Sequence, residues 1–232
     1  MDRRCISQVL ASRPDSQHAA AIIRHAQRHP LGSTTDPTKA LLTDAGKAAA
    51  VALGGRITGF THLRLFHSPV MRCQQTAECI AEGAAGSGMH IELCGARPRL
   101  GFVCTKDEAA ALTLYTQIGD DFVSRWLEGV LPAGMMEDPA ETVGHNLREI
   151  CATLEHGTAR GPRLDLHVSH DWNIMVMREL LVGVRHEERG WLGFLDGLAF
   201  HRSSPRELTV TYDTVQRTGP LPWEKFCLRQ GA

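Results

Sequence analysis

Residues 19–30 read Ala-Ala-Ala-Ile-Ile-Arg-His-Ala-Gln-Arg-His-Pro, an apolar run that leads directly into cationic and titratable side chains. A run of small and β-branched residues without alternation is typical of a strand buried on both faces, as in a parallel sheet. Ligands of open parallel α/β sheets bind beyond the carboxyl ends of the strands. Arg24, His25 and Arg28 are therefore predicted to form a ligand site, and two arginine forks favour a phosphate group.

Two further predicted strands end in similar side chains. Residues 62–67 predict a strand, and the following Ser68 and Pro69 predict a helix that Ser68 caps and that carries Arg72 in its first turn. Free backbone N–H groups in that turn favour anions. Residues 163–169 predict another strand, which ends in His170 and Asp171. Because these groups follow strands of one sheet, we expect them to converge on a single site.

The other elements complete an α/β pattern. Residues 42–53 predict a helix capped by Thr43, residues 91–93 a short strand, and residues 197–201 and 207–212 an antiparallel pair that closes the sheet. Residues 101–160 predict a helical cap insertion, with helices over 107–118, 121–129 and 141–156. The predicted fold is a three-layer α/β/α domain, 1–232, with a mostly parallel central sheet. Residues 1–17 show no clear period and are interpreted as a loosely held lead-in.

Composition limits the classes of partner. The chain has 25 basic and 26 acidic side chains, interspersed, which gives no indication of a nucleic-acid or membrane partner. Seven cysteines without a Cys-x-x-Cys pair predict reduced thiols in the cytoplasm. The paired arginines near the start are followed by no sustained apolar run, so we expect no signal peptide. His25 and His29 have no third ligand nearby in sequence, which predicts no metal site.

Five segments in order resemble motifs of the histidine phosphatase superfamily, also called the phosphoglycerate mutase-like or histidine acid phosphatase fold. Residues 24–28 resemble its Arg-His-Gly-x-x-Arg signature with Ala26 in place of glycine, and residues 42–46 its Leu-Thr-x-x-Gly helix start. Residues 68–77 resemble its Ser-Pro-x-x-Arg-x-x-Gln-Thr-Ala segment, residues 141–148 its cap helix, and residues 169–171 its late histidine motif. The methyl group of Ala26 is expected to narrow or reshape the site entrance.

The resemblance implies a covalent phosphohistidine mechanism with no cofactor or metal. His25 is then the nucleophile, kept neutral by nearby cations. The groups expected around the phosphoryl oxygens are Arg24, Arg28, Arg72 and His170. These residues are also the expected phosphate-binding groups.

The same resemblance makes Asp171 the proton donor to the leaving oxygen. Its place after histidine resembles the acid phosphatase and phytase branch, whereas mutase-like members take the acid from a mid-chain glutamate. Asp107 and Glu108 are therefore reserves, and a helix-capping role for Asp171 is the alternative. Glu108 and His145 are also expected to bind substrate. Trp126 and Trp172 are candidates for the pocket wall or for ordinary core packing.

The expected function is that of a cytoplasmic, metal-independent phosphatase acting on a small phosphorylated metabolite. One alternative is mutase-like phosphoryl transfer, which needs a bisphosphate primer and releases little phosphate. A phosphohistidine protein phosphatase is the next alternative, against which the predicted cap argues. A non-catalytic phosphate-binding module is the alternative from another class, although a binder needs no nucleophile. The oligomeric state is left open, with a homodimer as one option.

Overall fold

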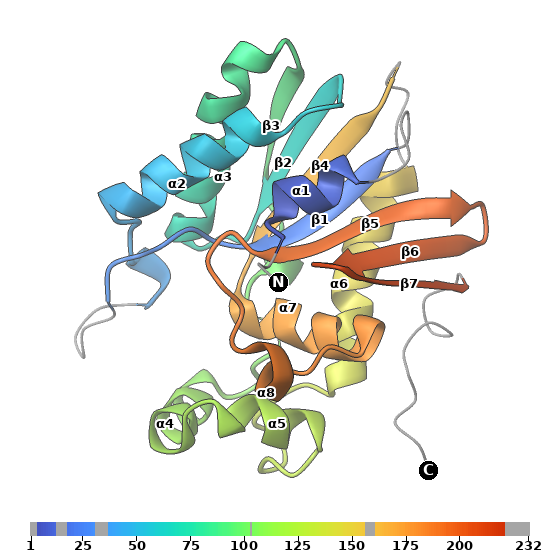
Figure 1. Ribbon diagram of the computed structural model, residues 1–232. Coiled ribbons are helices and arrows are strands. Elements are labelled where there is room, and N and C mark those ends of the chain that lie inside the picture. Colours follow the sequence, from blue (N-terminus) through green and yellow to red (C-terminus); the bar gives the residue numbers. More distant parts are fainter. Residues whose placement is uncertain (1–3, 13–17, 31–36, 103, 156–160, 221–232) are drawn as a thin grey trace.

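The computed structural model describes residues 4–12, 18–30, 37–102, 104–155 and 161–220. In this part of the chain the centre is a seven-stranded sheet with the order β3-β2-β4-β1-β5-β6-β7 (Figure 1). The strands are β1 (Ala19–Arg24), β2 (His62–His67), β3 (His90–Ala96), β4 (Arg163–Ser169), β5 (Gly197–Ser204), β6 (Glu207–Tyr212) and β7 (Val215–Pro220). Strands β1 to β4 pair in parallel, and β5 to β7 are added antiparallel. The predicted α/β class with a mostly parallel centre is confirmed.

The helices pack on both faces of this sheet and beyond one end of it. The α-helices are α1 (Ile6–Ala11), α2 (Asp44–Arg56), α3 (Met71–Ala84), α4 (Glu108–Ile118), α5 (Asp121–Leu127), α6 (Pro139–Glu155), α7 (Asp171–Met177) and α8 (His186–Arg189). Short 3-10 turns are η1 (Pro37–Lys39), η2 (Ala85–Ser87) and η3 (Pro98–Leu100), and η4 (Arg178–Val182) is a π-helical continuation of α7. None of the described helices combines the length and the apolarity that crossing a membrane requires.

Strand β1 lies at the centre because both of its faces are apolar. Ala20 and Ile22 belong to the core on one side of the sheet, and Ala21 and Ile23 belong to the core on the other. The first core is completed by side chains of α6, α7 and η4, and the second by side chains of α1, α2 and α3. Figure 1 shows the resulting three layers, helix on sheet on helix.

The strand register brings the predicted site residues together. Arg24 at the end of β1 pairs with Ser169 at the end of β4, and His67 at the end of β2 pairs with Val168. Consequently His25 and His170 leave the sheet side by side. This convergence at the carboxyl edge is the one predicted from the order of the strands and the residues that follow them.

Helices α2 and α3 cross at glycines. A β-carbon on Gly54 would lie 2.1 Å from the Ile80 carbonyl oxygen, and one on Gly83 would lie 1.9 Å from the Val51 carbonyl oxygen. Only glycine allows the two backbones to approach this closely. The α2–α3 layer therefore depends on two glycines on opposite helices.

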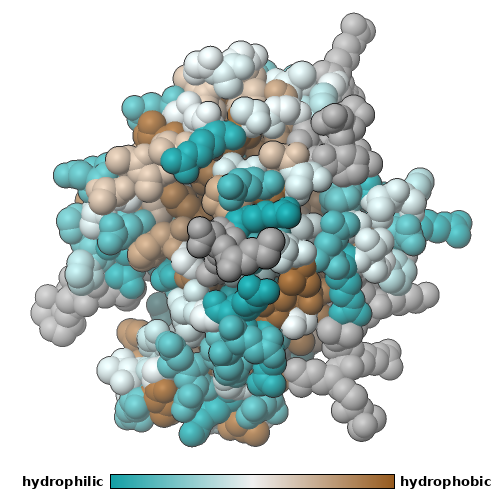
Figure 2. All heavy atoms as spheres, in the orientation of Figure 1, coloured by the Kyte–Doolittle hydropathy of each residue, from teal (hydrophilic) through white to brown (hydrophobic). Residues whose placement is uncertain are grey.

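The cap is smaller than the predicted insertion over residues 101–160. Helices α4 and α5 stand beyond the carboxyl edge of the sheet, with a small core of Ala111, Phe122 and Met135 (Figure 1). Helix α6, in contrast, packs on β1, β4 and α7 and belongs to one of the two helical layers. On the face shown in Figure 2, hydrophilic residues cover most of the cap and apolar spots remain small.

Three local predictions differ from the structure. Residues 6–11 form α1, which buries Ile6, Val9 and Leu10 against β5, so this part of residues 1–17 is not loosely held. Helix α3 begins at Met71 with Val70 as its N-cap, so Ser68 does not cap it. Strand β7 was not expected, because its alternating side chains include a proline and a glycine.

Candidate active site

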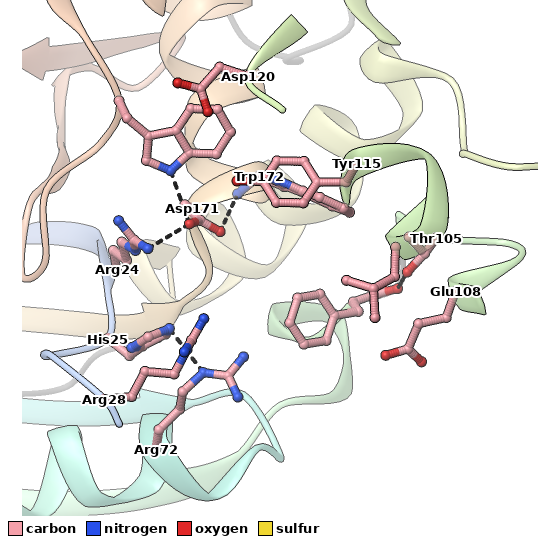
Figure 3. Close-up of a pocket in the computed structure, with 13 residues that line it drawn as sticks. Arg24, His25, Arg28, Arg72, Thr105, Glu108, Tyr115, Asp120, Asp171 and Trp172 are labelled. Atoms are coloured by element: carbon pink, nitrogen blue, oxygen red, sulfur yellow. Dashed lines mark hydrogen bonds and ion pairs between the residues drawn. The ribbon is translucent and has the colours of Figure 1, made fainter. Parts of the chain in front are cut away.

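A cavity of about 460 Å³ opens beyond the carboxyl ends of β1 and β4, between the sheet edge and the cap (Figure 3). Its described lining consists of Arg24, His25, Arg28, Arg72, Phe102, Thr105, Glu108, Leu112, Tyr115, Asp120, Asp171, Trp172 and Trp191. Five of the predicted site residues, Arg24, His25, Arg28, Arg72 and Asp171, are therefore brought together, with Glu108 as a sixth. The volume lies in the range of small-molecule sites.

His25 is fixed as a neutral imidazole by its contacts. Its backbone N–H donates to the Ser169 carbonyl (3.0 Å), and its Nδ1–H donates to the Ala26 carbonyl (2.7 Å). Nε2 must then carry the lone pair, and it accepts a hydrogen bond from Nε of Arg72 (2.9 Å). Burial, followed by the charge of Arg72, lowers the pKa of His25 to about 3. The ring nitrogen on the cavity side is therefore unprotonated at neutral pH, which makes it chemically able to act as a nucleophile.

Arg72 connects the two histidines that follow β1 and β4. Besides its bond to His25, its Nη2 donates to Nδ1 of His170 (3.2 Å). Nε2 of His170 consequently carries a proton and donates to Oγ of Ser68 (2.9 Å). Ser68, predicted as a helix cap, instead orients this histidine.

His170 lies behind the cavity wall rather than on it. The side chain is buried, and its ring stacks on Phe102 at a centroid distance of 4.0 Å. Burial and the neighbouring arginines hold its pKa well below the usual value, so it is neutral. Its role in this geometry is to fix Arg72 and Phe102.

Arg24, the last residue of β1, forms an ion pair with Asp171. Its Nη2 lies 2.7 Å from Oδ2 of Asp171, and its Nη1 donates to the Leu192 carbonyl (2.5 Å). The guanidinium also lies 4.4 Å from the ring centroid of Phe194. These contacts fix the guanidinium at the sheet edge of the cavity.

Arg28 is positioned by the first turn of α2. Gln27 accepts a backbone hydrogen bond from Thr43 (3.0 Å), and a β-carbon on Gly46 would lie 2.1 Å from the Gln27 carbonyl oxygen. The Leu-Thr-x-x-Gly motif therefore supports the loop that carries Arg28. Thr43 also caps α2, as predicted, by accepting from the Gly46 N–H (3.0 Å).

Asp171 accepts hydrogen bonds on both carboxylate oxygens. Oδ2 pairs with Arg24 and accepts a hydrogen bond from the indole N–H of Trp191 (3.1 Å). Oδ1 accepts a hydrogen bond from the backbone N–H of Trp172 (3.1 Å). Both oxygens of this side chain are therefore held by protein donors. The N-cap position of α7 is held by His170, so Asp171 is the first residue of the helix and not its cap.

Besides His170, three candidate site residues named from the sequence do not line the cavity: His145, Trp126 and Asp107. His145 pairs with Glu137 (Nδ1 to Oε1, 3.1 Å) and does not line the cavity. Trp126 is buried in the core and donates to the Glu137 carbonyl (2.7 Å). Asp107 caps α4 by accepting from the Ala110 N–H. Glu108 and Trp172 do line the cavity.

Sequence reasoning missed most of the cap-side wall. Phe102, Leu112, Tyr115, Asp120 and Trp191 line the cavity, but they come from α4, from the residue before α5 and from loops. The signal available in the sequence was the aromatic content of residues 102–126, which reads equally well as core. Among described residues, one group offers three metal-ligand side chains, Glu179, His186 and Glu187, and none of them lines the cavity.

Comparison with known proteins agrees with this geometry. Residues 20–93 match the histidine phosphatase superfamily (branch 1), a stretch that excludes the His170–Asp171 pair on which the likeness to the other branch depends. No protein in a set of curated sequences matches the chain.

Solved structures share the fold at low sequence identity. "Mycobacterial hydrolase 1" is 16% identical with a TM-score of 0.54, covering 87% of this chain and 96% of its own. A mycobacterial glucosyl-3-phosphoglycerate phosphatase is 19% identical with a TM-score of 0.52, covering 79% and 90%. A phosphoglycerate mutase from Bacillus anthracis is 16% identical with a TM-score of 0.50, covering 89% and 94%. The match over residues 20–93 and the shared fold together confirm the predicted resemblance of this chain to the histidine phosphatase superfamily.

Proposed function

We propose that this protein is a phosphatase that hydrolyses small phosphomonoesters through a phosphohistidine intermediate on His25. The observation that carries the proposal is a neutral, unprotonated Nε2 in a cavity that also holds three arginines. An anion-binding pocket alone has no need for a nucleophile oriented by hydrogen bonds on both ring nitrogens. The metal-independent mechanism and cytoplasmic location expected from the sequence belong to the same proposal.

The reaction begins when phosphoryl oxygens accept hydrogen bonds that protein atoms accept in the free protein. Nε of Arg72 moves its hydrogen bond from His25 to a phosphoryl oxygen, which frees the Nε2 lone pair for in-line attack on phosphorus. A bond forms between Nε2 and phosphorus while the ester oxygen leaves with a proton from a carboxylic acid. The resulting carboxylate then takes a proton from water, whose oxygen attacks phosphorus and releases phosphate and free His25.

The contacts favour Glu108 over Asp171 as the acid. Both oxygens of Asp171 are already engaged by Arg24, Trp191 and Trp172, which gives this side chain a positioning role. Glu108 lines the same cavity from the first residue of α4, with no hydrogen bond or ion pair to another described residue. In this mechanism Asp171 positions Arg24, and Glu108 transfers the proton.

Hydrolysis of p-nitrophenyl phosphate tests the nucleophile. We expect His25→Ala to lower kcat by a factor of about 1000 or more and His25-bound phosphate to be trapped from the parent protein in base-quenched mass spectrometry. Equal rates for parent and variant would exclude this mechanism. Bisphosphate-dependent transfer with little released phosphate would instead favour the mutase alternative.

The dependence of the rate on the substrate's leaving group distinguishes Glu108 from Asp171 as the acid. An alkoxide needs a proton and p-nitrophenolate does not, so loss of the acid should slow alkyl phosphates by a further factor of about 100 or more. We expect this selective loss for Glu108→Gln. Asp171→Asn should slow both substrates equally, because it weakens the position of Arg24. A selective loss in Asp171→Asn alone would return the proton-donor role to Asp171.

A further inference from the structure

The cavity is divided into a cationic half and a half without cations. Arg24, Arg28 and Arg72 are its described arginines and come from the sheet edge and α3. Across the cavity the described carboxyl groups are those of Glu108 and Asp120, which come from the cap side (Figure 3). One phosphoryl group therefore accounts for all the arginines, and no described cation faces the rest of a substrate.

The half without cations has an aromatic wall that is rigid before any ligand enters. The Tyr115 ring meets the Trp172 ring edge-on, at a centroid distance of 5.4 Å and an angle of 68°. Trp172 in turn stacks on the buried Phe122 at 4.8 Å and 17°. The ring centroids of Tyr115 and Trp191 lie 6.2 Å apart, and the indole N–H of Trp191 donates a hydrogen bond to Asp171. This network leaves the two ring orientations fixed.

Apolar surface next to these rings remains open. Leu112, one turn from Tyr115 on α4, lines the cavity with 46% of its surface exposed. Phe102 also lines the cavity, and its ring stacks on that of His170. A ligand that covers these groups removes apolar surface from water, which contributes binding energy in proportion to the area.

On the basis of the proposed phosphatase function, we propose that the natural substrate carries an aromatic or heteroaromatic ring and no second anionic group. The ring lies against Tyr115 and Trp172, while the phosphoryl group occupies the arginines. Offset or edge-to-face contact with aromatic side chains adds binding energy that a saturated ring does not gain. A second anion would meet the Asp120 carboxylate without a cation to neutralise it.

Tyr115 supplies a neutral hydroxyl at this wall. Burial and the nearby carboxylates of Asp171 and Asp120 raise the pKa of its phenol, so the group keeps its proton at neutral pH. It can therefore donate a hydrogen bond to an oxygen or nitrogen atom of the ligand ring.

The ring is tested with matched alkyl esters. Phenylethyl phosphate and cyclohexylethyl phosphate have leaving alcohols of similar acidity and similar bulk, and they differ in the flat ring. We expect kcat/KM to favour the phenyl ester by about tenfold. Equal values, or a preference for the saturated ring, would overturn the proposal.

A pair of variants on α4 assigns this preference to the wall. Tyr115→Leu should reduce the tenfold ratio to about two, while the neighbouring exposed control Gln117→Leu should keep it. Because the readout is a ratio of two substrates, a general loss of folded protein does not move it. A ratio unchanged in Tyr115→Leu would contradict the placement of the ring.

The charge argument has its own test with phosphoglycerate, which carries a second anion. Asp120→Lys should raise kcat/KM for this substrate by about tenfold, and the control Asp121→Lys, which does not line the cavity, should leave it unchanged. A parent protein that already prefers phosphoglycerate to phenylethyl phosphate would overturn the substrate class. If no ester is hydrolysed and His25→Ala equals the parent, it is instead the phosphatase function that fails.

Discussion

The tautomer of His25 is the most decisive single-residue feature. Hydrogen bonds assign the proton to Nδ1, and a pKa of about 3 keeps Nε2 free of protons at ordinary pH. We predict that ¹⁵N NMR of the folded protein shows a protonated Nδ1 and a bare Nε2 for His25, without titration between pH 5 and 8. The same histidine in urea should titrate near pH 6.5. A midpoint near 6.5 in the folded state would show that the imidazole is exposed to water.

Ala26 occupies a different place from the one expected. Its methyl group is fully buried in the apolar core beside β1 and does not line the cavity, so it does not narrow the entrance. Its backbone N–H donates to Oγ1 of Thr76 (3.0 Å), which fixes the loop. Alanine in place of the family's glycine therefore affects packing rather than access.

A substitution to glycine tests this interpretation. Ala26→Gly removes a buried methyl group and adds backbone freedom to the unfolded chain, so we expect the free energy of unfolding to fall by about 1–2 kcal/mol. KM for p-nitrophenyl phosphate should change less than twofold. Urea unfolding and steady-state kinetics on the same preparation measure both, and a large change in KM with unchanged stability would contradict the buried position.

At the scale of elements, the α2–α3 contact offers a test with adjacent residues. A β-carbon on Gly54 would lie 2.1 Å from the Ile80 carbonyl, whereas one on Gly55 would lie 3.5 Å from the Gly83 carbonyl, an ordinary contact. We predict that Gly54→Ala destabilises the fold by about 3 kcal/mol or more through overpacking. Gly55→Ala should stabilise it by about 0.5–1 kcal/mol because alanine is the better helix former.

Urea unfolding midpoints of the parent, Gly54→Ala and Gly55→Ala test these two opposite changes in stability. Opposite signs at neighbouring positions would show that packing, and not helix propensity, sets the outcome. A loss in both variants would mean that α2 tolerates no side chain along this segment.

Elements with local signals could be predicted from the sequence, and those set by distant contacts could not. β2, β4 and β6 have the predicted bounds because periodicity and turn residues define them locally. Ser68 stands where the sequence pattern predicts a helix cap, yet its hydroxyl is hydrogen-bonded to His170, 102 residues away. The place of α6 in a helical layer, rather than in the cap, likewise depends on tertiary contacts with β1 and β4.

The candidate site divides in the same way. Arg24, His25, Arg28 and Arg72 follow strand ends, so chain order and the topology of parallel sheets predict their convergence. Tyr115 and Trp191 reach the cavity through cap packing and through a contact with Asp171, and neither has a sequence signature. Consequently the arginine side of the cavity could be predicted from the sequence, while its aromatic side required the structure.

For the molecule as a whole, buried neutral histidines link folding to pH. His167 is fully buried, stacks on Phe66, and has its pKa lowered to about 4 by burial; Asp165 opposes this shift, and Arg97 and Arg64 add to it. The unfolded state takes up its proton near pH 6.5, so the folded state is disfavoured as the pH falls from 6.5 toward 4. His25 and His170 act in the same direction.

The expected loss can be assigned to one residue. At pH 5 His167 should contribute about 2 kcal/mol of lost stability relative to pH 7.5. We predict that His167→Gln, although less stable than the parent at pH 7.5, loses about 2 kcal/mol less between the two pH values in urea unfolding. Identical pH dependence would show that His167 is protonated in the folded protein.

The close approach of the Gln27 backbone to Gly46 determines whether the loop that carries His25 and Arg28 can be moved to another scaffold. Because the loop carrying Arg28 rests against the first turn of α2, with Thr43 and Gly46 holding the Gln27 backbone, the loop and that turn form one mechanical unit. Grafting the Arg-His-x-x-Arg stretch alone onto a foreign parallel sheet would transfer His25 without the turn of α2 that supports its loop. The smallest portable fragment therefore runs through residue 46, and a transplant that ends at Arg28 would leave its second arginine unplaced.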